Sequence, residues 1–133
     1  MNLNKETINY DIDRMSAIKE AEEKGLKVVY PKDTELLLDI DTEEHMQLFE
    51  ERAEYLNQFL PIDFEIKQSQ SGHPHYHIYV TLEDRKGPLA DVERIFLQLF
   101  LGSDPTREFL SYLRVLSGEE LPTLLLEKNN EKL

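Results

Sequence analysis

The feature of this sequence that most constrains its fold is a repeated change of hydrophobic period between residues 35 and 127. Short stretches in which every second residue is apolar alternate with longer stretches in which apolar residues recur every three or four positions. The first pattern is typical of a β-strand with one buried face, and the second is typical of an amphipathic helix. Because each strand needs another layer to cover its apolar face, the chain is expected to combine helices with a sheet.

The order of these stretches predicts the topology. Strands are expected at residues 35–41, 63–70, 75–82 and 122–127, and helices at residues 43–60, 88–101 and 104–118. This order matches the split βαβ plan, in which an antiparallel sheet carries its helices on one face. We therefore predict an α+β fold of the ferredoxin-like or RRM-like kind. In that plan the strands at 35–41 and 75–82 lie side by side at the centre of the sheet.

Local signals define the ends of several helices. Pro61 closes the first of them, and Asp104 followed by Pro105 is typical of a helix N-cap and first helical position. Gly118 is expected to end the helix that Asp104 begins. The inward residues of the helix at 88–101 are expected to be Leu89, Val92, Ile95, Phe96 and Leu99.

A further helix and a short strand are predicted ahead of this unit. Ile12, Met15 and Ile18 recur every three residues, and Gly25 is a typical helix stop. Residues 26–30 then have the pattern of a short strand. The 133 residues are expected to form one domain, with residues 1–10 and 128–133 as frayed ends.

Composition excludes several classes of protein. The chain has no cysteine, which excludes a disulfide scaffold and thiolate metal sites and is typical of a cytoplasmic protein. No apolar run approaches the roughly 18 residues that span a bilayer, and the N-terminus lacks the apolar segment of a secretory signal. The formal net charge of −12 repels polyanions, so a nucleic-acid role requires a local basic patch or a bound metal.

Polar side chains are predicted to gather on the face of the sheet that the helices leave uncovered. Side chains alternate along a strand, so an inward set of Leu36, Leu38 and Ile40 leaves an outward pair, Asp39 and Asp41. The outward residues of the two neighbouring strands are His75, His77, Tyr79, Lys67 and Ser69. Two carboxylates this close repel each other, and a divalent cation is a common reason to tolerate them.

Each motif also has a purely structural interpretation. The aspartate pair is consistent with a solvated strand end, and Asp41 stands where a cap for the next helix is expected. A His-x-His pair is often an exposed strand face without a ligand. The combination of both pairs on neighbouring strands favours a metal site. Oxygen ligands alone suit Mg²⁺ or Mn²⁺, and a mixed Asp and His site suits Mn²⁺ or Zn²⁺.

Two segments, "LLLDIDTEE" and "SQSGHPHYHIYV", resemble the catalytic core of archaeo-eukaryotic-type primases, which include the primase–polymerases of phages and plasmids. In that family an Asp-x-Asp pair at a strand end binds two divalent metals, and a later Ser-Gly…His motif supplies a histidine for the nucleotide's phosphates. The resemblance implies that Asp39 and Asp41 bind Mg²⁺ or Mn²⁺. It implies that Ser71 and His77 contact a nucleoside triphosphate, with Asp39, Asp41 and His77 as the catalytic residues. The implied activity is metal-dependent nucleotidyl transfer in DNA replication, with a DNA template as a candidate partner.

A third segment, "GSDPTREFLSYLR", is similar to a downstream segment of small phage proteins of this kind. By that likeness Asp104 is a candidate third acid at the metals, and Arg107 and Arg114 are candidate phosphate contacts. Lys67 is a further candidate for nucleotide binding. Glu127 on the last strand is a rival third acid, because the family usually carries this acid on a strand. The chain is short for a full primase, so a protein partner is a candidate source of the missing module.

Two other functions are compatible with the same residues. "PHYHIYV" also resembles the His-hydrophobic-His (HUH) strand of rolling-circle and relaxase-type nucleases, in which His75 and His77 would bind one metal and a tyrosine would attack the phosphate. Tyr112 is the candidate nucleophile, but its neighbours Phe109 and Leu113 predict a core position for its ring. The third alternative is a non-catalytic acidic phage or plasmid accessory protein derived from such a fold, which the small size and the charge favour.

Overall fold

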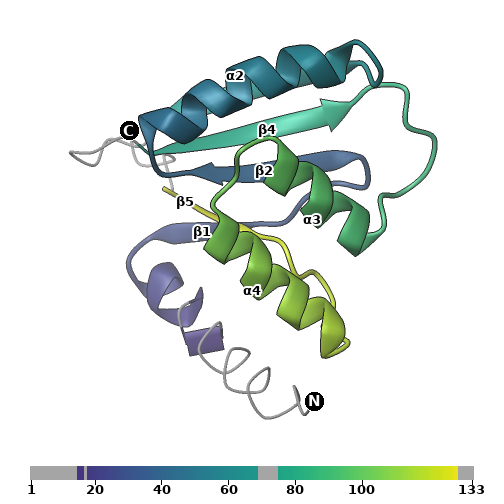
Figure 1. Ribbon diagram of the computed structural model, residues 1–133. Coiled ribbons are helices and arrows are strands. Elements are labelled where there is room, and N and C mark those ends of the chain that lie inside the picture. Colours follow the sequence, from purple (N-terminus) through teal and green to yellow (C-terminus); the bar gives the residue numbers. More distant parts are fainter. Residues whose placement is uncertain (1–14, 17, 69–74, 129–133) are drawn as a thin grey trace.

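The structure, a computed structural model, describes residues 15–16, 18–68 and 75–128. It confirms a mixed α+β fold with two small antiparallel sheets, compatible with the split βαβ plan (Figure 1). The elements are β1 (Leu26–Val29), β2 (Glu35–Ile40), α2 (Glu43–Asn57), β3 (Ile62–Gln68), β4 (Tyr76–Leu82), α3 (Asp91–Phe100), α4 (Pro105–Leu116) and β5 (Leu125–Lys128). Residues 15–16 and 18–23 are also helical.

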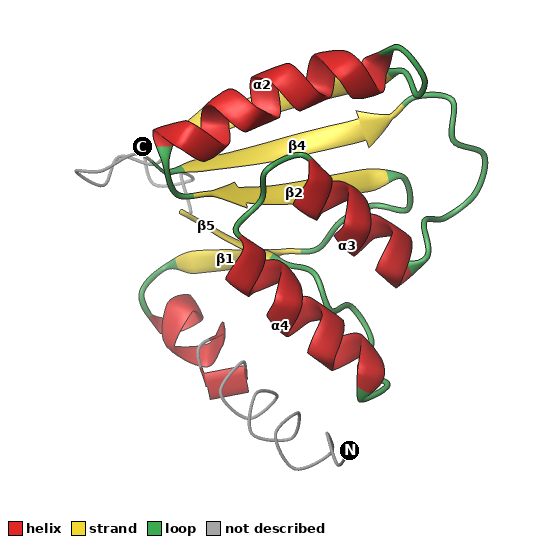
Figure 2. Ribbon diagram, in the orientation of Figure 1, coloured by secondary structure: helices red, strands yellow, loops and turns green. Residues whose placement is uncertain are grey.

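The larger sheet has the strand order β2-β4-β3, and both pairings are antiparallel. Figure 2 shows α2 lying along this sheet, with helices in red and strands in yellow. The predicted inward residues Leu36, Leu38, Ile40, Ile78 and Val80 are fully buried, but Leu37 on the opposite face of β2 is fully buried as well, so β2 alternates less strictly than predicted. Helix α2 completes this core with Met46, Phe49, Ala53 and Leu56.

The beginning of α2 settles one of the alternatives for the aspartate pair. The hydroxyl of Thr42 accepts a hydrogen bond from the His45 N–H at 3.1 Å, so Thr42 is the N-cap. Asp41 precedes the cap and is not itself the N-cap. The helix starts at Glu43 as predicted and ends at Asn57, shortly before Pro61.

Strand β2 lies at an edge of its sheet, because β5 pairs with β1 in a separate two-stranded sheet. The prediction of a central position is therefore wrong for β2, although its pairing with β4 is confirmed. Side chains from α3, α4 and the turn between them bind the free edge. The Leu37 N–H donates to Gln98 Oε1 at 2.9 Å, and the Leu37 carbonyl accepts from Arg107 at 2.6 Å. The Asp39 N–H donates to Ser103 Oγ at 3.0 Å, and an edge bound in this way is protected from pairing with another strand.

This role explains why α3 turns a partly polar side toward β2. Arg94 and Gln98 are buried there beside Ile95, because their side chains satisfy backbone groups of β2 and the loop before it. The expectation of a purely apolar inward face is therefore wrong. Val92, Phe96 and Leu99 are exposed, at 50%, 65% and 44%.

The N-terminal part agrees with its prediction where it is described. Gly25 follows the helical residues with a φ of 84°, a conformation that favours glycine at a helix end. Lys128 pairs with Leu26 in the β1–β5 sheet, so its predicted fraying is wrong. The other predicted frayed residues, 1–10 and 129–133, lie outside the described residues, as does Ile12. Within the described part of the chain, no helix has the length and apolar character needed to cross a membrane.

Candidate metal and nucleotide site

The two predicted motifs face each other on paired strands. Asp39 of β2 is opposite His77 of β4, and His77 is opposite Lys67 of β3. Residues opposite each other in antiparallel strands share one face of the sheet. These three residues therefore form a row across the sheet, on the face away from the core that α2 covers. The predicted adjacency of the aspartate strand and the histidine strand is confirmed.

Three carboxylates gather where β2 ends. Asp39, Asp41 and Asp104 each offer an oxygen that lies within 4.8 Å of the others, and we call these three residues the carboxylate group. Asp104 is brought there by the turn between α3 and α4, because its N–H donates to the Asp39 carbonyl at 2.7 Å. Gly102 permits this turn: its φ is 99°, and a Cβ at this position would lie 2.9 Å from the carbonyl oxygen of His45.

Asp104 has a capping role as well. Its Oδ1 accepts a hydrogen bond from the Thr106 N–H at 3.1 Å at the start of α4, which confirms the N-cap interpretation. An ionised carboxylate has about four lone-pair positions on its two oxygens. The cap and a cation at the carboxylate group are therefore compatible.

Two imidazoles approach the same aspartate. His75 Nε2 lies 2.8 Å from Asp39 Oδ1 and 3.5 Å from Asp41 Oδ1. His77 Nε2 lies 3.7 Å from Asp39 Oδ1, and the two imidazole rings meet edge to face with centroids 4.8 Å apart. Asp39, His75 and His77 thus form a second group of three potential ligands. Asp39 belongs to both groups.

Glu127 of β5 lies over the face of the sheet that was expected to be open. Its carboxylate binds His77 Nδ1, and Lys67 Nζ is 3.9 Å away. Burial alone would raise the pKa of Glu127. The hydrogen bond and charge of His77 outweigh this effect and, with contributions from Tyr79 and Lys67, hold the pKa below its ordinary value. Glu127 is therefore a partner of His77, and the expectation of an uncovered face is corrected.

Lys67 and Tyr79 complete the surroundings of Glu127. Burial, and then the charge and hydrogen bond of Glu127, raise the pKa of Tyr79, so this phenol remains protonated across the neutral range. The Lys67 ammonium lies 4.7 Å from the centre of the Tyr79 ring. Lys67 is thus beside His77 as predicted, with its charge directed toward Glu127.

The other residues predicted to contact a nucleotide are Ser71, Arg107 and Arg114. Ser71 lies outside the described residues. The guanidinium of Arg107 donates to the carbonyls of Leu37 and Leu124, at 2.6 and 2.7 Å, and to Glu108. These bonds join β2 to the segment before β5. They give Arg107 a structural role, and its contact with a nucleotide stays a prediction.

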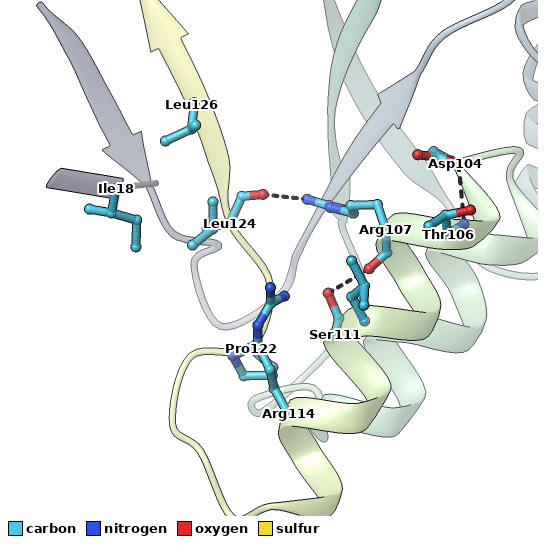
Figure 3. Close-up of a pocket in the computed structure, with 10 residues that line it drawn as sticks. Ile18, Asp104, Thr106, Arg107, Ser111, Arg114, Pro122, Leu124 and Leu126 are labelled. Carbon is cyan, nitrogen blue, oxygen red and sulfur yellow. Dashed lines mark hydrogen bonds between the residues drawn. The ribbon is translucent and has the colours of Figure 1, made fainter. Parts of the chain in front are cut away.

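Arg114 and Arg107 line a cavity of about 260 Å³ between α4 and the segment that leads into β5 (Figure 3). Its other polar lining residues are Asp104, Thr106 and Ser111, and its apolar lining residues are Ile18, Leu110, Pro122, Leu124 and Leu126. Because Asp104 belongs both to this lining and to the carboxylate group, the cavity and the carboxylate group are neighbours.

A buried polar network behind the site was not predicted. Gln98 Nε2 donates to Glu108 Oε1 at 2.8 Å, and Ser103 Oγ donates to Glu108 Oε2 at 2.7 Å. All three side chains are almost completely buried, and Gln98 and Ser103 also bind the edge of β2. The only signal in the sequence was the position of Gln98, three residues after the inward Ile95.

Tyr112, the candidate nucleophile, is not in the core. Its side chain is 39% exposed on α4, and that of Phe109 is 57% exposed, whereas Leu113 is buried. The prediction of a packed ring is therefore wrong. Exposure alone does not connect Tyr112 with the histidines.

Comparison with protein-family models, with curated proteins and with solved structures finds no match to this chain. Function is therefore inferred from the geometry of the site.

Proposed function

We propose that this protein is a metal-dependent nucleotidyltransferase of the DNA primase or primase–polymerase type, acting in DNA replication. The observation that supports this best is the group of three carboxylates, Asp39, Asp41 and Asp104, within 4.8 Å of one another. Carboxylate oxygens are the ligands that Mg²⁺ and Mn²⁺ prefer, so the donor set fits these ions.

The charges around the site explain why a cation would be needed. Among the described residues, Asp39, Asp41, Asp104 and Glu127 bring four carboxylates to the row of polar residues and its surroundings, and Lys67 brings an ammonium. In a chain of net charge −12 this arrangement repels a triphosphate. When bound, divalent cations would supply local positive charge and stabilise the attacking and leaving oxygens of the transfer.

The side chains have distinct roles in this proposal. Asp39, Asp41 and Asp104 hold the cation. His77 is oriented by Glu127, and a ring protonated on both nitrogens would donate from Nε2 to a phosphate oxygen beside the carboxylate group. Lys67, opposite His77 on β3, adds a positive charge, and Arg114 reaches the nucleotide from the cavity beside Asp104. A DNA template and a partner protein that completes the site belong to the same proposal.

An HUH nuclease is the second candidate, because Asp39, His75 and His77 also form a group of three potential ligands. That reaction needs a tyrosine nucleophile, whereas nucleotidyl transfer does not. Tyr112→Phe should therefore leave nucleotide incorporation unchanged. A covalent phosphotyrosine adduct on DNA that disappears in this variant would favour the nuclease instead.

The direct test is incorporation of labelled nucleoside triphosphates on single-stranded DNA, with Mg²⁺ or Mn²⁺ and with both ribonucleotides and deoxyribonucleotides. Asp39→Asn and Asp41→Asn should abolish incorporation, and His77→Ala should weaken it. Asp63→Asn is the matched control, because Asp63 is exposed on β3 outside the site. Incorporation that survives Asp39→Asn contradicts the proposal. Absence of any product from the folded wild-type protein favours the accessory protein.

A further inference from the structure

His77 lies between two carboxylates, and this position determines the role of each ring nitrogen. Nδ1 binds Glu127, whereas Nε2 faces Asp39 Oδ1 at 3.7 Å, beyond ordinary hydrogen-bond distance. In the neutral ring that donates its Nδ1 proton to Glu127, the lone pair of Nε2 points toward an anionic oxygen. Two acceptors that face each other in this way attract each other only through a cation or a proton between them.

Glu127 stands where a metal-binding histidine usually has its outer hydrogen-bond partner. A carboxylate that accepts the Nδ1 proton selects the tautomer, fixes the orientation of the ring and makes Nε2 a stronger ligand. The Glu127 carboxylate is itself buried and lies beside Lys67, so its position does not depend on His77 alone.

The spacing of the donor atoms also fits a metal ion. Ligand atoms about 2.0–2.2 Å from a tetrahedral ion lie about 3.3–3.6 Å from one another. The distance from Asp39 Oδ1 is 2.8 Å to His75 Nε2 and 3.7 Å to His77 Nε2, so the two values lie on either side of this range. An entering ion would replace the hydrogen bond between His75 and Asp39, with shifts of about half an ångström.

We propose that Asp39, His75 and His77 bind a borderline divalent transition metal such as Zn²⁺, with Asp39 shared between this ion and the carboxylate group. Two nitrogen ligands and one oxygen ligand suit Zn²⁺ better than Mg²⁺. Three protein ligands leave a coordination position for water or a substrate oxygen. Glu127 is a positioning residue for His77 and does not touch the ion.

This site goes beyond nucleotidyl transfer, which requires only Mg²⁺ or Mn²⁺ at the carboxylate group, and a His77 ring that binds a metal through Nε2 does not donate from Nε2 to a phosphate. Its test measures the binding of a metal alone, so the result does not depend on whether nucleotides are joined.

The experiment is a titration of the metal-free protein with Co²⁺, followed by its visible absorption, and with Zn²⁺, followed by calorimetry. The wild type should bind one equivalent of each ion at Asp39, His75 and His77. His75→Ala and His77→Ala should each lower the affinity by at least about 100-fold, because each removes a ligand. His45→Gln is the matched control. His45 is a described histidine outside this group of ligands, and its ring contacts the Gly102 carbonyl. Asp104→Asn should leave Co²⁺ binding unchanged.

Glu127 variants test the positioning role. Glu127→Ala should weaken Co²⁺ binding by about 10- to 100-fold. Glu127→Gln should retain most of the affinity, because its amide oxygen still accepts the Nδ1 proton of His77. If Glu127 served stability alone, Glu127→Ala would lower the melting temperature without changing the Co²⁺ affinity.

Three results would overturn the proposal: no Co²⁺ absorption from the wild type, unchanged Co²⁺ affinity in His75→Ala and His77→Ala, or a loss in Asp104→Asn as complete as in His77→Ala. The last would assign a single ion to the carboxylate group. Failure to incorporate nucleotides with intact Co²⁺ binding would remove the proposed function and leave this site in place.

Discussion

Replacement of Glu108 should be among the most damaging changes in the chain, although its side chain binds Gln98, Ser103 and Arg107 rather than a proposed metal ligand. Its side chain is 1% exposed and accepts hydrogen bonds from Gln98 and Ser103, at 2.8 and 2.7 Å, and from Arg107. Those three donors also bind the edge of β2. Loss of the carboxylate therefore weakens the attachment of α3 and α4 to the strand that carries Asp39.

The expected magnitude follows from this geometry. Glu108→Ala leaves Arg107, whose side chain is only 14% exposed, without its charge partner, and removing one member of a buried pair costs about 3–5 kcal/mol. Glu108→Gln keeps the volume and one acceptor, and losing hydrogen bonds to a charged group costs about 1.5–3 kcal/mol. For a domain of this size the second value corresponds to a fall of about 5–15 °C in melting temperature.

The assay is urea and thermal unfolding followed by far-ultraviolet circular dichroism, because the chain has no tryptophan. Glu54→Gln, the same substitution at an exposed position of α2, should stay within about 0.5 kcal/mol of the wild type. Glu108→Gln should also weaken divalent-cation binding, because the turn that carries Ser103 and Asp104 loses its support. A Glu108→Gln protein as stable as the Glu54→Gln control would refute the reasoning.

Two further predictions concern the turn before α4 and the ion pair at the start of α3. Gly102→Ala should lower the free energy of unfolding by more than about 1 kcal/mol, and by more than Gly118→Ala does. Both glycines have positive φ, but only a Cβ at Gly102 would meet a backbone oxygen. Denaturant unfolding of both variants measures this, and equal losses of stability would contradict it. The hydrogen bond from Arg85 holds the pKa of Glu93 below its ordinary value. The pair therefore stabilises the fold at pH values above the pKa of an unfolded glutamate. This contribution is lost as the pH falls through the lower pKa of Glu93 in the folded protein. Glu93→Gln should therefore lower stability by no more than about 0.5 kcal/mol at pH 7, with the difference closing in acid; a difference that widens in acid would show the opposite sign.

The sheet and its row of polar residues could be predicted because they depend on local periodicity. Alternation along residues 35–41 and 75–82 separates Asp39 and His77 from the core, and the order of elements brings their strands together. These two inferences need no knowledge of side-chain contacts. They were sufficient to place the aspartates and the histidines on adjacent strands, whereas the register that sets Asp39 opposite His77 is seen only in the structure.

The edge of β2 could not be predicted from periodicity, because it depends on long-range contacts of individual polar side chains. Gln98 and Arg107 bind backbone groups of Leu37 that a fourth strand would otherwise occupy, and β5 pairs with β1 instead. The position of Glu127 over His77 follows from that pairing. A sequence pattern marks Gln98 only as one polar residue on a helix, so neither its burial nor its partner can be read from it.

The same limit applies to Asp104. Its cap before Pro105 was visible in the sequence, because capping is a local pattern. Its approach to Asp39 depends on the Gly102 turn and on the backbone bond to the Asp39 carbonyl, which joins segments far apart in the chain.

The central claim, that the carboxylate group binds a divalent cation, is tested most directly by titration of Mn²⁺ followed by electron paramagnetic resonance of the free ion. The informative protein is the double variant Asp41→Asn with Asp104→Asn. It keeps Asp39 and both histidines, and asparagine preserves the cap of α4. The wild type should deplete the free Mn²⁺ signal, and the double variant should bind Mn²⁺ at least about tenfold more weakly while still binding Zn²⁺. Equal Mn²⁺ binding by the two proteins would contradict the claim.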